Sequence, residues 1–260
     1  MLAVSLRESP PEQLTGVLAH ALTHAYLGTQ PVPKPFWLTE GVANFMGTVW
    51  TERQQGRDRA VASLEEGRMA LALAEPGSPG QGAGQPLATA ISPVYYRTKA
   101  THVLMMLRDM IGDDALSAAL RDYNASANAA GSGASEATGT GAFEQALKRA
   151  APSADFSWLF SDWIDADKGL PDLVVDKVFP NAVQSGNWLV SVNVSNAGFA
   201  TAEVPVIARS ADHTTAERVL VPARGSVVKR LLIQGKPTEV QVNDGIVPET
   251  QASVHVVKLD

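Results

Sequence analysis

Residues 188–194 read WLVSVNV, in which apolar and polar side chains alternate. This alternation predicts a β-strand with one buried face. Similar short runs rich in valine follow, and Gly, Pro, Asn or Asp separate them at intervals of roughly 8–12 residues, which is typical of a β-sandwich. These runs occupy residues 204–208, 218–221, 227–233, 240–242 and 254–257.

The sequence before residue 180 has a different period. Apolar residues recur at helical spacing in residues 14–25 and again in residues 103–111, which predicts amphipathic helices. Residues 75–86 and 124–141 are rich in Gly, Pro, Ser and Ala, and we expect both to form surface loops. The sequence therefore predicts a multi-domain α + β protein, with a mostly helical domain at 1–180 and a small β-sandwich at 181–260.

Composition excludes several classes of protein. The 260 residues include no cysteine, so disulfides, iron–sulfur clusters and cysteine-based zinc sites are excluded, and a metal must be held by histidine and carboxylate. The net charge is −6 without a dense Lys/Arg run, which argues against nucleic-acid binding. We expect a soluble chain without a signal peptide, membrane helix or membrane partner. The compartment and the oligomeric state stay open.

A pair of histidines stands out in the first predicted helix. His20 and His24 are four residues apart, so their side chains share one face and both rings can reach a single ion. Taken alone, such a pair more often represents two ordinary helix histidines. Glu40, in the sequence WLTEGVANF, opens the next apolar helical run. It can be a carboxylate favoured by the helix dipole, or it can complete a His₂Glu zinc site that leaves the fourth position open.

The segments LAHALTHAYLG and WLTEGVANF resemble the HExxH…E pattern of gluzincin zinc metallopeptidases, the relatives of thermolysin and aminopeptidase N. The resemblance implies a gluzincin-type helical catalytic domain followed by an immunoglobulin-like module. It implies His20, His24 and Glu40 as ligands of Zn²⁺. It further implies that Tyr96, or its neighbour Tyr95, stabilises an oxyanion.

The sequence departs from the gluzincin pattern in ways that bear on activity. The family has a general-base glutamate directly after the first histidine, where this chain has Ala21. Loss of a general base typically costs about 10²–10⁴-fold in rate. Ala21 is therefore either an engineered substitution, which we favour, or the mark of a natural pseudo-peptidase.

Asn44 lies one turn after Glu40. The resemblance makes it a candidate to support a ligand histidine, and the alternative is an ordinary exposed residue.

Two further departures concern specificity. The spacing between His24 and Glu40 is shorter than in aminopeptidase N relatives, and the segment that captures a substrate amino terminus in those enzymes is missing. We therefore expect either part of a larger peptidase or a compact relative, without aminopeptidase specificity. The leading expectation is a zinc-dependent metallopeptidase that hydrolyses peptide bonds and is inactivated at Ala21. The alternatives are a pseudo-peptidase that binds peptides or proteins, and a helical scaffold without metal.

Overall fold

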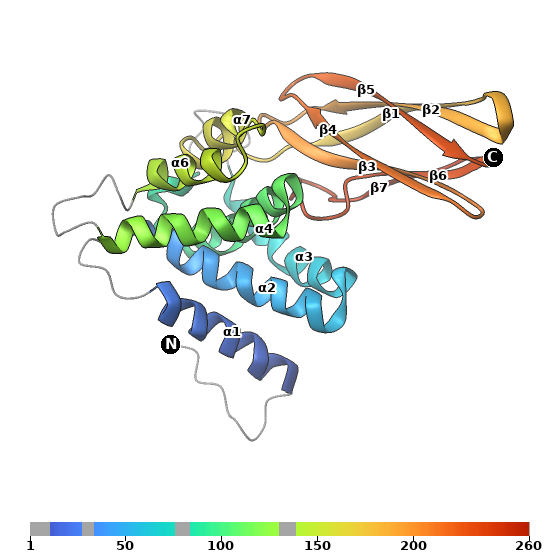
Figure 1. The fold of residues 1–260 in the computed structure, drawn as a ribbon. Coiled ribbons are helices and arrows are strands. Elements are labelled where there is room, and N and C mark those ends of the chain that lie inside the picture. The colour runs from blue at the N-terminus through green and yellow to red at the C-terminus, as the bar shows by residue number, and fades with distance from the viewer. Residues whose placement is uncertain (1–10, 28–33, 76–83, 130–138, 260) are drawn as a thin grey trace. The chain divides into compact units, whose positions relative to one another are not determined.

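The computed structural model describes residues 11–27, 34–75, 84–129 and 139–259 (Figure 1). Within these ranges the chain forms two compact units. The first unit comprises Met1–Gly67 and Gln85–Phe156, and the second comprises Arg68–Gly84 and Ser157–Asp260. The division between the units falls inside one helix, α3 (Arg57–Ala74).

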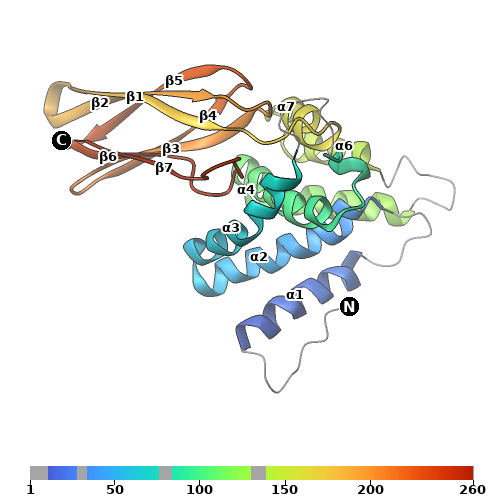
Figure 2. The same cartoon turned by 180° about the vertical axis from the view of Figure 1, so that it is seen from behind.

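The first unit is helical. Its long helices are α1 (Pro11–Leu27), α2 (Val42–Gln55), the first part of α3, α4 (Ala100–Ala129) and α6 (Thr140–Ala150). Short elements precede two of these helices: the π-helical turn η1 (Trp37–Gly41) leads into α2, and the π-helical turn η3 (Val94–Lys99) leads into α4. A 3₁₀ turn, η2 (Leu87–Thr89), precedes η3. Helices α1 and α2 lie side by side (Figures 1 and 2).

The core of the first unit gathers around aromatic side chains. Trp37 and Phe143 are fully buried, and their rings meet edge to face with 5.5 Å between centroids. Tyr123 packs on Phe143 in the same manner at 5.7 Å. The indole Nε1 of Trp37 also donates a hydrogen bond to Thr140 Oγ1 at 3.1 Å. Because Trp37 is the first residue of η1, these contacts fix the position of the end of η1 from which Glu40 follows.

The second unit contains two antiparallel sheets. One sheet has the order β1-β2-β5 and the other has the order β4-β3-β6-β7. The strands are β1 (Leu173–Ala182), β2 (Asn187–Asn196), β3 (Ala202–Ser210), β4 (Thr214–Val221), β5 (Ser226–Gln234), β6 (Pro237–Val242) and β7 (His255–Lys258), and a 3₁₀ turn, η5 (Gln184–Gly186), joins β1 to β2. Alternate residues are buried, as in Val190, Val192 and Val194 of β2, so the predicted period-two pattern is confirmed.

The predicted fold class needs correction. The described residues contain helices and two antiparallel sheets of three and four strands, and nothing in them identifies a large gluzincin domain followed by an immunoglobulin-like domain. The second unit is also not purely β, because it includes the short helix α7 (Ser157–Leu159) and the π-helical turn η4 (Phe160–Ile164). Strand β1 starts at Leu173, eight residues before the domain boundary that we predicted.

The loop predicted at residues 124–141 is also wrong at both ends, because α4 continues to Ala129 and α6 begins at Thr140, and residues 130–138 lie outside the described residues. The physical reason is a tertiary contact. Asn124 is buried, donates to the carbonyl of Tyr26 at 3.3 Å and accepts from Lys34 Nζ at 2.7 Å. These contacts stabilise a helical turn that the local composition disfavours. Of the loop predicted at 75–86, residues 76–83 lie outside the described residues.

No helix among the described residues is long and apolar enough to cross a membrane.

Candidate metal centre

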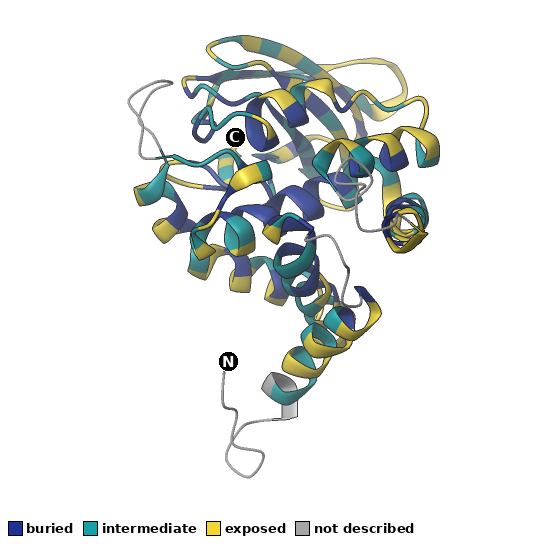
Figure 3. Ribbon diagram, turned by 90° about the vertical axis from the view of Figure 1, so that its left-hand side faces the viewer, coloured by how far each residue is buried: buried dark blue, intermediate teal, exposed yellow. Residues whose placement is uncertain are grey.

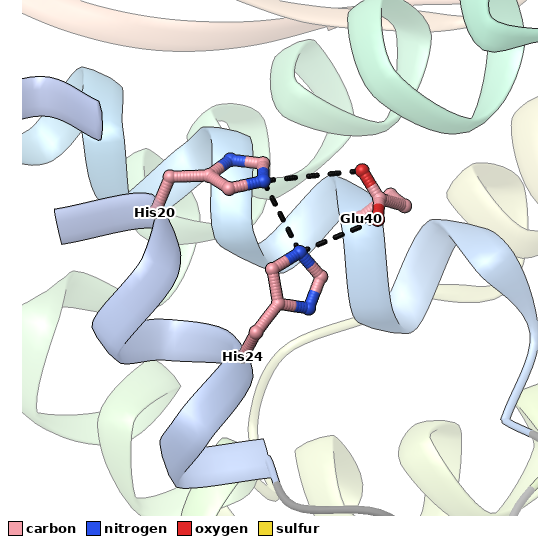
Figure 4. Close-up of side chains that lie close together, drawn as sticks. All are labelled: His20, His24 and Glu40. Carbon is pink, nitrogen blue, oxygen red and sulfur yellow. Dashed lines mark hydrogen bonds and ion pairs between the residues drawn. The ribbon is translucent and has the colours of Figure 1, made fainter. Parts of the chain in front are cut away.

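The structure brings three of the predicted site residues together (Figure 4). His20 and His24 project from α1, and Glu40 projects from η1. The Nε2 atoms of the two histidines are 3.1 Å apart. His24 Nε2 lies 3.3 Å from Glu40 Oε1, and His20 Nε2 lies 3.9 Å from Glu40 Oε2. This is the one group of three or more metal-ligating side chains that the described part of the chain contains.

These distances suit a tetrahedral ion. Two nitrogen ligands at about 2.05 Å from a tetrahedral zinc ion lie about 3.3 Å from each other, close to the observed separation of the histidine nitrogens. Two imidazoles and one carboxylate are also a donor set that zinc binds in catalytic sites. The three side chains are 24–38% exposed, so an ion held there would still have solvent access. The residues therefore fit zinc.

The local sequence explains how each ligand is placed. In α1 the four-residue spacing of the histidines puts both rings on one face, and the ring centroids are 4.8 Å apart. Glu40 lies in a π-helical turn, a wider turn that proteins often use at functional sites. The next residue, Gly41, lets this turn pack closely, since a Cβ there would come within 2.5 Å of Ala100 Cβ and 3.0 Å of the Tyr96 carbonyl oxygen.

Electrostatics favours the metal-binding form of one ligand. Burial lowers the pKa of His20, and the neighbouring His24 and Arg97 lower it further, against the opposing effect of Glu40. Since a metal binds the neutral imidazole, His20 is in the correct protonation state at neutral pH.

Other predicted site residues have different surroundings. Ala21 is exposed on α1 directly after His20 and provides no proton acceptor. Tyr95 is buried in the core, while Tyr96 is partly exposed and packs on Phe36 with 5.2 Å between ring centroids. Of the two tyrosines predicted as candidates to stabilise an oxyanion, Tyr96 is therefore the one accessible to solvent. Asn44 donates to the backbone oxygen of Glu40 at 2.8 Å, so its amide is engaged by its own helix rather than by a histidine.

The sequence reasoning missed Arg97. Its Nε and Nη2 atoms lie 3.1 and 2.9 Å from Glu40 Oε2, so it is in direct contact with the candidate metal centre. Arg97 follows Tyr96 in the sequence, but no local pattern pairs it with a carboxylate 57 positions earlier. Only the packing of η1 against η3 reveals the contact.

A second feature of the first unit is a groove of about 520 Å³ between α1, α2 and α4. Its apolar lining includes Leu18, Leu22 and Tyr26 of α1, together with Met46 and Trp50 of α2. The α1 residues follow a four-residue spacing offset by two positions from the histidines, which places them on another face of the helix. The groove is therefore separate from the candidate metal centre. Most of α1 is exposed or half-buried (Figure 3).

Comparisons with known proteins give no family. No protein-family model matches the chain, and no curated protein matches it. Similar solved structures include the β-glucosidase from Listeria innocua in complex with glucose, at 10% identity and a TM-score of 0.21, covering 35% of this chain and 16% of that one. The GH3 β-glucosidase of Bifidobacterium adolescentis has 18% identity, a TM-score of 0.21 and coverage of 39% and 19%. The β-glucosidase EmGH1 of Erythrobacter marinus has 17% identity, a TM-score of 0.22 and coverage of 39% and 18%.

These findings correct the family assignment. The chain spans less than a fifth of the length of those three structures, and TM-scores near 0.2 carry no statement about its own activity. No family model and no curated protein supports the gluzincin assignment. The prediction that the chain belongs to the gluzincins, and its description as an aminopeptidase-like member of that family of metallopeptidases, was therefore wrong. The candidate metal centre rests on its own geometry instead.

Proposed function

We propose that the protein binds one zinc ion through His20, His24 and Glu40, and that this site is hydrolytic, with the carbonyl group of a bound peptide as its target. The observation that carries the proposal is the convergence of the three donor side chains at distances suited to a tetrahedral ion. When bound at such a site, zinc polarises a carbonyl and lowers the pKa of its water ligand.

The chain's own residues set the rate in this proposal. His20, His24 and Glu40 would hold the ion, and their partial exposure would leave it accessible to solvent. Ala21 follows His20 on an exposed part of α1 and cannot accept a proton from water. The present sequence should therefore bind zinc and ligand but turn over slowly, because general-base catalysis is worth about 10²–10⁴-fold.

The first experiment measures zinc. We expect one zinc ion for each chain, by elemental analysis after loading and dialysis. Affinity is measured by competition with a coloured chelator. The variants His20→Ala and His24→Ala should each lose more than about 100-fold in affinity, since even indirect supports of a metal ligand are worth 10–100-fold. His213→Ala, at an exposed histidine of the second unit, is the matched control. Equal affinities in all four proteins would refute the site.

The second experiment concerns the missing proton acceptor. Ala21→Glu should raise hydrolysis of a mixed peptide library by about 10²–10⁴-fold over the unchanged chain. Ala21→Gln is the control, because it has nearly the same size but no carboxylate. A similar rate in both variants, with zinc bound, would argue against the hydrolytic proposal.

The second candidate function is binding without turnover. The apolar groove beside α1 supports it, because an apolar concave surface suits a peptide or protein ligand. It differs from the first proposal in one outcome: zinc still binds, but Ala21→Glu gives no increase in hydrolysis.

A further inference from the structure

Arg97 contacts only one of the two oxygens of Glu40. Both of its nearest donors, Nε at 3.1 Å and Nη2 at 2.9 Å, point to Oε2. The other oxygen, Oε1, lies 3.3 Å from His24 Nε2. The two oxygens therefore differ: Oε2 is bound by the guanidinium and lies 3.9 Å from His20 Nε2, whereas Oε1 lies closer to a histidine of the candidate metal centre.

The arginine is itself held in place. It lies in the π-helical turn η3, and its backbone carbonyl accepts a hydrogen bond from Thr101 Oγ1 at 2.8 Å. Its guanidinium carbon lies 5.7 Å from the centre of the Tyr96 ring, within the range of a cation–π contact. Phe36 packs on the same ring from the segment that leads into η1.

Stability does not explain this arrangement. The Arg97 side chain is 45% exposed and that of Glu40 is 24% exposed, and exposed ion pairs contribute little to the free energy of unfolding. The contact does fix the direction of a carboxylate that has two histidines as neighbours. Groups that hold a metal ligand in one orientation typically contribute 10–100-fold to metal affinity.

We propose that Arg97 is a positioning residue, which holds Glu40 through Oε2 so that Oε1, the oxygen nearer to His24 Nε2, is the one presented to the metal. This inference rests on the proposed zinc site and adds a residue to it. It makes Glu40 a ligand through one oxygen, with the second oxygen engaged by the protein.

The direction in which zinc affinity changes when Arg97 is removed distinguishes a positioning role from a purely electrostatic one. A fixed positive charge near a cation site repels the cation, so a purely electrostatic Arg97 weakens zinc binding and its removal strengthens binding. A positioning Arg97 has the opposite effect: its removal frees the Glu40 carboxylate to rotate and weakens binding.

The test measures the zinc affinity of the full chain by chelator competition. Arg97→Ala should bind zinc 10–100-fold more weakly than the unchanged protein. Arg97→Lys keeps the charge but offers one donor group in place of two, and it should recover only part of the loss. Arg149→Ala is the matched control, because Arg149 forms an exposed ion pair with Asp122 elsewhere in the first unit; its affinity should not change. Unchanged or tighter binding by Arg97→Ala would overturn the proposal.

A metal-free measurement keeps this inference distinct from the proposed function. In crystals of Arg97→Ala grown without metal, Glu40 Oε1 should leave its position 3.3 Å from His24 Nε2. If the carboxylate stays in place, Arg97 does not position it, whatever the zinc affinity. If the unchanged protein binds no zinc although Glu40 moves in the variant, the zinc site fails while the positioning contact stands.

Discussion

Glu249 is the most buried acidic residue among the described residues of the second unit. It is 0% exposed, and it accepts hydrogen bonds from the backbone nitrogen of Leu173 and from Asn243 Nδ2, both at 2.8 Å. His255 Nε2 lies 2.9 Å from the same carboxylate. A buried carboxylate needs such partners, so this group of residues joins β1, β7 and the segment before β7.

The first prediction concerns pH. The hydrogen bond to Glu249 raises the pKa of His255, against the lowering effect of burial. A raised pKa in the folded state means that the stabilisation is complete below the unfolded value of about 6.5 and is lost as pH rises through the folded value. We expect the free energy of unfolding of the second unit to fall as pH rises above about 6.5.

The measurement is urea unfolding at several pH values, followed by hydrogen exchange of the strands. His255→Gln keeps a hydrogen-bond donor but does not titrate, so it should lose this part of the pH dependence. His213→Gln, at an exposed position, should keep it. The same pH dependence in His255→Gln as in the unchanged protein would contradict the assignment.

At the scale of elements, the contact between η1 and η3 depends on one glycine. Gly41 has an ordinary helical backbone, with φ −63° and ψ −46°, so the requirement is for space rather than for unusual dihedral angles. Its missing side chain lets η1 approach Ala100 and the carbonyl of Tyr96. The same approach brings Glu40 within reach of Arg97.

The second prediction follows from that spacing. Gly41→Ala should destabilise the first unit by about 1–3 kcal/mol, the usual cost of overpacking, and should also weaken zinc binding. Gly47→Ala is the control in α2, the helix that follows η1, because a Cβ there meets only Gly16 O at an ordinary 3.7 Å. It should leave stability unchanged or raise it by about 0.5–1 kcal/mol, since alanine is the better helix former. Urea unfolding measures both; equal stability of the two variants would contradict the packing argument.

Elements also show where sequence reasoning succeeds and fails. The period of two in residues 188–194 correctly predicts β2, because its valines face a core. Strand β1 was missed, since Val174 and Phe179 are exposed and Pro180 interrupts the pattern. Such a strand is tolerated at a sheet edge, and β1 is an edge strand.

The turn η4 shows a long-range contact that no local pattern predicts. Asp162 accepts a hydrogen bond from the backbone nitrogen of Thr201 at 3.0 Å, and Trp163 Nε1 donates to the carbonyl of Thr201 at 2.8 Å. Both contacts attach η4 to the residue before β3. The candidate metal centre could likewise be predicted only in part. The spacing of His20 and His24 is visible in the sequence, whereas the Arg97 contact depends on how distant turns pack.

At the scale of the whole molecule, the two units should respond separately to metal. The three proposed ligands all belong to the first unit. A ligand that binds only the folded state stabilises it by about 2.7 kcal/mol at 100 times its dissociation constant. The third prediction is therefore that zinc slows hydrogen exchange in α1 and η1 but leaves the strands β2, β3 and β5 unchanged.

Mass spectrometry of hydrogen exchange, with and without zinc, makes this measurement. His24→Ala should show no difference between the two conditions. Protection of the strands to the same degree as α1, or no protection of α1 in the unchanged protein, would count against a metal centre confined to the first unit.

The exposure of α1 gives the metal centre one more consequence. Leu18, Leu22 and Tyr26 are each more than half exposed, so this helix buries little apolar surface. Glu40 follows His24 by 16 residues, and an ion bound by both would crosslink the chain as a disulfide does. Closing a loop of about 15 residues is worth about 3 kcal/mol in the chain-entropy account. For α1, removal of zinc by a chelator would thus be equivalent to reducing a disulfide bond in a chain that has no cysteine.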